Sequence, residues 1–255
     1  MKYEEEFNAG KAAIAKASKI LMKYYSGKPL SKRNKGEHDM VTEADLAAEK
    51  AMMDIIKKYF PRHNILSEEC GEINNGGGAR WIIDPLDGTH NFYFGLPLWG
   101  TMLAFEASGR VEFSIIALPV FEELYTAIKG GGSTLNGKKI SVSDRKEKFL
   151  ASFSLKDHND PVIRKKFDLF ADKFHRKFRS FGCIGLSGCL IATGRMNIQV
   201  ATKTSPWDIA PVALLVEEAG GKVTDFSGNP WKPALGSYLM SNGKIHQQIL
   251  DVISG

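Results

Sequence analysis

Residues Arg80–Phe92 read RWIIDPLDGTHNF, and they place two carboxylates, Asp84 and Asp87, directly after a short apolar run. The apolar run is typical of a buried strand. Pro85 cannot donate to a strand ladder and restricts the residue before it to an extended backbone, so we expect the ladder to stop here. Gly88 then favours a turn. The stretch predicts a strand end that presents two acids beside free backbone N–H groups, although a surface turn with solvated acids stays open.

The length and composition of the chain describe an ordinary globular protein. Its 255 residues can bury a sizeable core, as one large domain or two intimate halves. Hydrophobic residues make up 43% and charged residues 25%, and no apolar run approaches the ~20 residues of a membrane helix. The first residues, MKYEEEFNAG, carry acids where a signal peptide has a basic start. We therefore expect a protein without a membrane span.

The cysteines indicate the redox compartment, and the net charge bears on the class of binding partner. Cys70, Cys183 and Cys189 cannot all pair within one chain and form no CxxC motif, which indicates a reducing, cytoplasmic setting without a zinc site. The net charge of +5 permits attraction to phosphates. However, the basic residues are scattered through SKRNKG, RKKF and HRKFR, as on solvated faces. Nucleic acid is therefore an unlikely partner.

The hydrophobic pattern predicts mixed helices and strands without internal repeats. A first helix is expected at residues 3–26, and a second runs from 42 to 59, with Leu46, Met53, Ile56 and Phe60 as its buried face. Further strands are expected at 64–67, 81–84, 100–107, 111–118, 123–129, 149–155 and 196–202, and further helices at 160–177, 185–194, 208–219 and from 244. Layers without a steady βαβ rhythm predict an α+β sandwich of two halves.

The stretch Gly132–Lys139, GSTLNGKK, matches the GxxxxGK pattern of a nucleotide-binding loop. It has Lys139 where such a loop needs Ser or Thr for magnesium, and it lies between strand-like runs instead of opening a helix. A hairpin turn explains it better, so nucleotide hydrolysis by this route is discarded.

Other acids lie at the ends of predicted elements, as Asp84 and Asp87 do. Glu68 and Glu69 follow the strand at 64–67, Asp208 begins a helix, and Asp45 lies in the first turn of another. Taken singly, the two aspartates could cap their helices and the glutamates could be solvated. Taken together, carboxylates without matched His or Cys favour a hard cation, magnesium rather than zinc.

The chain resembles the lithium-sensitive, magnesium-dependent inositol monophosphatase family. The matching stretches occur in the family's order and span nearly the whole chain: WIIDPLDGTHNF, ILSEEC and SPWDIAPVALLVEEAGG, with weaker echoes in DMVTEAD, RSFGCIG and SNGKIH. The resemblance implies an αβαβα sandwich, usually a homodimer, that hydrolyses small phosphomonoesters. It also implies one domain over 1–255, in which residues 1–145 hold most metal ligands and residues 146–255 supply Asp208.

The resemblance also implies a set of metal ligands. Glu68, Asp84 and the backbone carbonyl of Leu86 would hold a first magnesium ion. Asp84, Asp87 and Asp208 would hold a second, and a third, looser ion would lie near Glu68. Two ions about 4 Å apart can stabilise both oxygens of an in-line displacement, and the first would lower the pKa of a bound water. Asp87 would also face the substrate.

The catalytic and phosphate-binding roles follow from the same resemblance. Glu68 and Thr89 would act on the attacking water, and Asp45 would orient Thr89 through a hydrogen bond. The backbone N–H groups of Gly88 and Thr89 would bind the phosphate. Glu69 would lie next to the metal ligands without binding the metal itself.

The chain departs from the family at several substrate-binding positions. Ala201 stands seven residues before the WD aspartate, where inositol-specific members carry a glutamate, and Lys203 follows two residues later. Cys183 replaces a Ser or Thr, and Pro211 an alanine. Lys35 matches the family's lysine only if one residue is deleted before the DMVTEAD stretch.

These departures bear on the substrate. Loss of a hydroxyl-binding carboxylate beside a lysine favours fructose 1,6-bisphosphate at least as a co-substrate with inositol 1-phosphate. Histidinol phosphate and 3′-phosphoadenosine nucleotides stay open. A different class, a non-catalytic regulatory relative that binds phosphosugar or RNA, is disfavoured because the residues that would activate water are intact.

Overall fold

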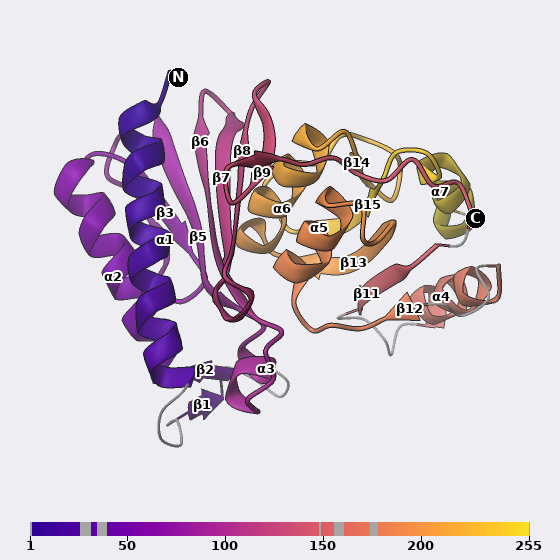
Figure 1. Cartoon of the computed structure of the whole chain (residues 1–255), viewed down its shortest axis with the longest axis horizontal. Coiled ribbons are helices and arrows are strands. Elements are labelled where there is room, and N and C mark those ends of the chain that lie inside the picture. The colour runs from indigo at the N-terminus through magenta and orange to yellow at the C-terminus, as the bar shows by residue number, and fades with distance from the viewer. Residues whose placement is uncertain are drawn as a thin grey trace.

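The computed structural model describes residues 2–25, 32–34, 40–147, 149–155, 161–173 and 178–254. Two large β-sheets alternate with three layers of helices (Figure 1). Helices α1 and α2 cover the outer face of the first sheet, α5 and α6 lie between the sheets, and α4 and α7 cover the second sheet. This arrangement confirms the predicted α+β fold with an αβαβα order of layers.

The first sheet has eight strands in the order β10-β9-β8-β7-β6-β5-β3-β4, and β3 and β5 pair in parallel. Its outer face packs against α1 and α2, and the two-stranded sheet β1-β2 precedes α2. These elements are α1 (Glu4–Tyr25), β1 (Lys32–Asn34), β2 (Met40–Thr42), α2 (Glu43–Tyr59), β3 (Asn64–Ser67), β4 (Gly71–Ile73), β5 (Ala79–Asp87), α3 (Thr89–Tyr93), β6 (Gly100–Ala107), β7 (Arg110–Leu118), a 3-10 turn (Pro119–Phe121), β8 (Glu123–Ile128), β9 (Gly132–Leu135) and β10 (Lys138–Lys139).

The second sheet has five strands in the order β12-β11-β13-β15-β14. Helix α6 is apolar all round because it lies between the two sheets, and every residue from Ile209 to Val216 is buried. The elements of this half are β11 (Ala151–Leu155), α4 (Pro161–Lys173), β12 (Phe178–Arg179), α5 (Ile184–Ala192), β13 (Ile198–Thr204), α6 (Pro206–Glu218), β14 (Lys222–Asp225), β15 (Gly236–Ser241) and α7 (His246–Ser254).

Two local predictions were wrong. Strand β5 does not stop at Pro85 but continues to Asp87, and its pairing with β6 shifts register between Asp84 and Asp87. The irregularity accommodates a residue that has no N–H to donate. Leu46 is 47% exposed, because the buried face of α2 passes instead through Asp45 and Glu49.

The GSTLNGKK stretch forms the β9–β10 hairpin, as the sequence predicted. Asn136 and Gly137 take positive φ angles of 49° and 77° in its turn. Both angles fit a tight hairpin connection. In the part of the chain that the structure describes, no helix is long and apolar enough to span a membrane.

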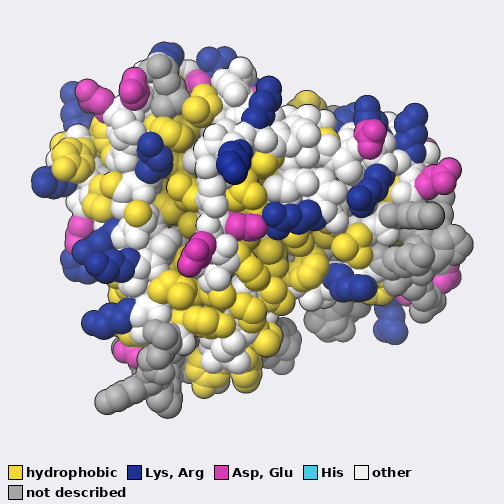
Figure 2. All heavy atoms as spheres, in the orientation of Figure 1, with side chains coloured by type: hydrophobic (Ala, Val, Ile, Leu, Met, Phe, Trp, Pro, Cys, Tyr) yellow, Lys and Arg dark blue, Asp and Glu magenta, His cyan; other side chains and the backbone are white. Residues whose placement is uncertain are grey.

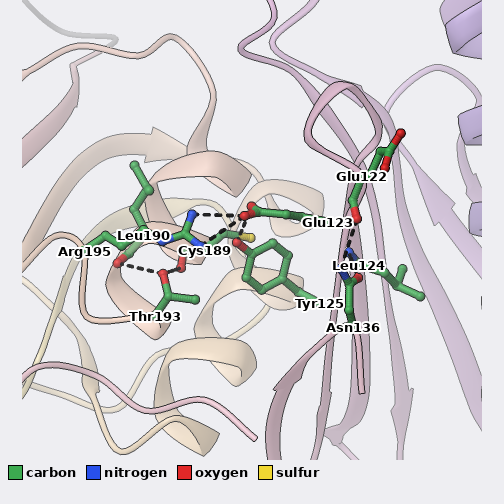
Figure 3. Close-up of polar contacts among 9 residues, drawn as sticks. All are labelled: Glu122, Glu123, Leu124, Tyr125, Asn136, Cys189, Leu190, Thr193 and Arg195. Atoms are coloured by element: carbon green, nitrogen blue, oxygen red, sulfur yellow. Dashed lines mark hydrogen bonds and ion pairs between the residues drawn. The ribbon is translucent and has the colours of Figure 1, made fainter. Parts of the chain in front are cut away.

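A hydrogen-bonded cluster ties the first sheet to the helices between the sheets (Figure 3). Arg195, just beyond α5, donates from Nη1 and Nη2 to Oε1 of Glu123 at 3.0 and 3.1 Å. The buried Tyr125 donates its hydroxyl to Oε2 of the same carboxylate at 2.6 Å. Both oxygens of Glu123 are thus engaged, which fixes β8 against the end of α5.

His246 ties the last helix to the second sheet. The buried ring lies 2.9 Å from the hydroxyl of Thr224 through Nε2 and 2.9 Å from the hydroxyl of Ser241 through Nδ1. Burial, assisted by the charge of Lys222, lowers the pKa of His246 from its usual 6.5 to about 4. The folded protein therefore holds this ring neutral over a range in which the unfolded chain binds a proton.

We expect the contribution of His246 to the free energy of unfolding to fall as the pH drops from 6.5 towards 4, because only the unfolded chain protonates His246 in this range. His246→Gln should remove this part of the pH dependence, as urea denaturation at pH 7 and pH 5 would measure. The matched variant of the exposed His90, His90→Gln, should keep the wild-type profile. Parallel profiles for wild type and His246→Gln would contradict the assignment.

Candidate active site

Four acidic side chains from three parts of the chain meet at one end of the first sheet. Asp84 and Asp87 lie on β5, and Glu68 follows β3, where its N–H donates to the carbonyl of Ile83 at 3.2 Å. Asp208 lies in the first turn of α6. Burial raises the pKa of Asp84 well above its usual range, and the nearby charges of Glu68, Asp87 and Asp208 raise it further. The structure therefore brings the four carboxylates together.

Asp84 and Asp87 are held where ionisation is unfavourable. Asp84 is 1% exposed, and its Oδ1 accepts a hydrogen bond from the N–H of Leu86 at 3.1 Å. Burial raises the pKa of Asp87 to about 6, although its hydrogen bonds oppose the shift. A bound cation would relieve both the burial cost and the mutual repulsion of these groups.

Three hydrogen bonds from the beginning of α5, in the helix layer between the two sheets, hold Asp87. The thiol of Cys183 donates to Oδ2 at 2.9 Å, the N–H of Ile184 to Oδ1 at 3.2 Å, and the N–H of Gly185 to Oδ2 at 2.6 Å. A Cβ atom on Gly185 would lie 2.8 Å from Oδ2 of Asp87. Glycine therefore allows the backbone to approach the carboxylate this closely.

Cys183 has a different place from the expected substrate contact. Its thiol is buried behind Asp87, and it also accepts a hydrogen bond from the N–H of Leu186 at 3.4 Å as the N-cap of α5. Burial and the charge of Asp87 raise the pKa of the thiol well above its usual range, so it stays protonated and donates. Cys183 therefore orients a carboxylate instead of lining the surface.

Helix α2 carries Asp45 to the site, where it meets Thr89, the first residue of α3. The hydroxyl of Thr89 lies 3.1 Å from Oδ1 of Asp45 and 3.0 Å from the carbonyl of Leu86. Asp45 also accepts hydrogen bonds from the N–H and hydroxyl of Thr42 in a capping box. Burial raises the pKa of Asp45, and these hydrogen bonds oppose the shift. Helix capping and orientation of Thr89 are thus both functions of Asp45.

Asp208 likewise caps its helix and faces the acidic cluster. Its Oδ2 accepts a hydrogen bond from the N–H of Ser205 at 3.0 Å in a capping box. Pro211 is buried further along α6, and nothing in the structure explains why a proline stands there.

Gly88, the N-cap of the short helix α3, has a φ of 89°. A Cβ atom there would lie 2.8 Å from the carbonyl oxygen of Leu98. Both the backbone conformation and the close approach favour glycine at this position. The turn after Asp87 therefore depends on Gly88, as the sequence suggested.

The remaining candidate residues differ in their placement. Lys35 lies outside the described residues. Ala201 is not on the surface but is buried in the core between the sheets, opposite Tyr238 in the β13–β15 pairing. Lys203 is exposed and has a φ of 49°, where this pairing shifts between Ala201 and Thr204. Such a backbone is unusual for a residue other than glycine, and it interrupts the regular alternation of side chains.

Glu49 was missed by the sequence analysis, although it lies under the site. Its Oε1 accepts hydrogen bonds from the hydroxyl of Ser67 at 2.5 Å, the N–H of Glu69 at 3.2 Å and the N–H of Cys70 at 3.1 Å. The available signal was a carboxylate four residues after Asp45, on a helix face that is otherwise apolar.

The fold and the site define a class of protein: a layered α+β fold with a group of carboxylates, two of them buried, at one end of the first sheet. The chain belongs to the inositol monophosphatase family, whose model matches residues 2–254. This membership assigns the chain to the phosphatases as a broad class.

Named relatives of this chain include two phosphatases with different substrates and a Nus factor. It is 34% identical over 241 residues to the fructose-1,6-bisphosphatase/inositol-1-monophosphatase of Thermotoga maritima, covering 94% of this chain and 93% of the relative. It is 36% identical to the histidinol-phosphatase of Chlorobaculum parvum, covering 84% and 83%. It is 34% identical to the Nus factor SuhB of Escherichia coli K12, covering 95% and 93%.

The fold is also similar to that of solved structures. The extragenic suppressor protein suhB from Bartonella henselae superposes with a TM-score of 0.91 at 28% identity, covering 98% of each chain. The layered arrangement is thus shared with a chain of quite different sequence.

Gly185→Ala should lower phosphatase activity on the order of 100-fold, because the new methyl group displaces Asp87 and misplacement of a reacting group by about 1 Å has that effect. Release of inorganic phosphate would measure the loss. Gly78→Ala is the matched control, since a Cβ atom there meets nothing within 4 Å. Wild-type turnover in Gly185→Ala would show that the position of Asp87 does not matter for the reaction.

Proposed function

We propose that this protein is a Mg²⁺-dependent phosphomonoesterase that hydrolyses a small phosphorylated sugar or polyol, such as inositol 1-phosphate or fructose 1,6-bisphosphate. The observation that carries the proposal is the group of four acids in which Asp84 and Asp87 are buried, Glu68 and Asp208 are half-buried, and the charges of the other three raise the pKa of Asp84. Buried like charges are costly without a counter-charge, and phosphoryl transfer uses a cation at such a site.

The donor atoms of the cluster fit magnesium. They are carboxylate oxygens with the nearby carbonyl of Leu86, and hard cations prefer oxygen ligands. Among the described residues, no three His, Cys, Asp or Glu side chains form a ready-made metal cage. The carboxylates would therefore adjust their side-chain positions when an ion binds.

We assign the ligands accordingly. Glu68, Asp84 and the Leu86 carbonyl would hold one ion; Asp84, Asp87 and Asp208 would hold another; a third ion would lie near Glu68. When bound, Mg²⁺ would supply positive charge to the phosphoryl oxygens and make water more acidic.

The chain's own residues would position the reactants. The Thr89 hydroxyl, set between Asp45 and the Leu86 carbonyl, would orient the attacking water together with Glu68. The turn at Gly88 and Thr89 would bind the phosphate through backbone N–H groups. Asp87 would keep its orientation through its bonds to α5.

Asp84→Asn should lose nearly all turnover, because this carboxylate is shared by both proposed ions. Phosphate release from a generic phosphomonoester, with Mg²⁺ and with EDTA, would measure this loss. At pH 7.5 in EDTA the variant should be more stable than wild type, because the raised pKa of Asp84 makes its ionisation unfavourable in the folded state. Turnover that is independent of Mg²⁺, or an active Asp84→Asn variant, would refute the assignment.

The proposed substrate class rests on β13. Ala201 is buried in the core between the sheets, and its methyl group offers no acceptor for a sugar hydroxyl. Lys203 is exposed two residues before the N-cap of α6, the helix that carries Asp208. We propose that its ammonium group contacts a second phosphate, which favours a bisphosphate over inositol 1-phosphate.

Lys203→Ala should therefore raise the KM for fructose 1,6-bisphosphate about tenfold or more, and the KM for inositol 1-phosphate much less, since a charge-assisted hydrogen bond contributes about 1.5–3 kcal/mol. Steady-state kinetics on both substrates would measure the difference, with histidinol phosphate and a 3′-phosphoadenosine nucleotide in the same panel. Lys222→Ala, on the exposed edge strand β14, is the matched control. Equal effects of Lys203→Ala on both substrates would leave a general phosphomonoesterase.

We also propose a homodimer in a reducing, cytoplasmic setting. Hydrophobic side chains gather on the surface over α3 and beside it (Figure 2), where Phe94 is 71% and Leu96 47% exposed. An apolar patch of this kind is typical of a protein–protein contact.

All three cysteines are free thiols, which fits a reducing compartment.

A further inference from the structure

Glu49 is a buried carboxylate that the proposed reaction does not use. It lies on α2 and is 6% exposed, and one oxygen, Oε1, accepts three hydrogen bonds. A buried carboxylate is stable only where donors compensate for its lost hydration. The three donors of this site come from Ser67, Glu69 and Cys70, the residues on either side of Glu68.

These contacts fix the segment that carries Glu68. Strand β3 ends at Ser67, and Gly71, with a φ of 72°, lets the chain turn back into β4. The N–H groups of Glu69 and Cys70 lie within this turn, and Glu49 supplies their acceptor. On the other side, the N–H of Glu68 is bound to β5 through the carbonyl of Ile83 at 3.2 Å. The backbone of Glu68 is therefore held from two directions.

The same helix supports the opposite side of the site. Asp45 precedes Glu49 by four residues, and side chains at this spacing lie on one face of a helix. Asp45 accepts from the hydroxyl of Thr89, whereas Glu49 accepts from the turn around Glu68. Helix α2 thereby sets the position of the Thr89 hydroxyl relative to Glu68.

We propose that Glu49 is a positioning residue that holds Glu68 towards Asp84 and thereby sets the affinity of the acidic cluster for divalent cations. The proposal rests on the proposed function, in which Glu68 is a metal ligand. Groups that orient a metal ligand typically change metal affinity by about 10–100-fold when they are removed.

Glu49→Gln tests the proposal because it keeps the size of the side chain and removes its charge, which weakens the hydrogen bonds from the two N–H groups. We expect Mn²⁺, measured by electron paramagnetic resonance without substrate, to bind about 10–100-fold more weakly than to wild type. The Mg²⁺ concentration for half-maximal phosphate release should rise by a similar factor, while kcat at saturating Mg²⁺ changes much less.

Two further variants make the test specific. Asp54→Asn is the matched control, because it changes an exposed carboxylate on the same helix, paired with Lys50. It should leave Mn²⁺ binding unchanged. Ser67→Ala removes one of the three donors and no charge, so it should weaken Mn²⁺ binding by a smaller factor. It provides the same test if Glu49→Gln does not fold.

The outcomes separate this proposal from the proposed function. Wild-type Mn²⁺ affinity in folded Glu49→Gln, or in Ser67→Ala where Glu49→Gln does not fold, would overturn the role of Glu49 and leave the phosphatase assignment intact. Absence of Mn²⁺ binding in the wild type would overturn the metal site itself. Lower thermal stability of Glu49→Gln with unchanged Mn²⁺ affinity would show that Glu49 serves only the fold.

Discussion

The burial of several carboxylates in one place is the constraint on which the site depends. Asp84 and Asp87 lie on the same strand, and the charge of Asp208 reaches both. Their repulsion must be opposed by neighbouring groups, and the structure does so with hydrogen bonds: α5 donates to Asp87, and the N–H of Leu86 donates to Asp84. These hydrogen bonds do not fully offset burial, because the pKa values of both carboxyl groups remain raised.

Two of the acids lie at helix N-termini, where they also accept hydrogen bonds from backbone N–H groups that the helix leaves without a partner. Asp45 and Asp208 each occupy the third position of a helix and complete a capping box. Each accepts a backbone N–H that would otherwise lack a partner. From sequence alone, capping and catalysis are competing interpretations of these aspartates. In the structure they are compatible, because a carboxylate has two oxygens and the cap of Asp45 engages only one of them.

The features that short sequence patterns predicted by themselves are the local ones, whereas the order of layers and the placement of Asp208 with the other acids were expected from the family resemblance. The strand before Asp84, the helix after Thr42 and the β9–β10 hairpin follow from short patterns and formed as expected. The features that it missed depend on residues far apart in the chain: Gly185 and Asp87 are separated by 98 residues. The burial of Ala201 and of Cys183 is likewise decided by packing between the two sheets, which no local pattern contains.

The presence of a thiol at position 183 also has a physical consequence. A thiol is a weaker donor than a hydroxyl, so Asp87 gains less from this side chain than it would from Ser or Thr. The shortest contact to the carboxylate is instead the N–H of Gly185 at 2.6 Å. The orientation of Asp87 in this chain therefore depends more on backbone than on side-chain donors. Backbone donors at the start of a packed helix cannot rotate away, so a weaker side-chain donor at position 183 is compatible with a well-ordered site.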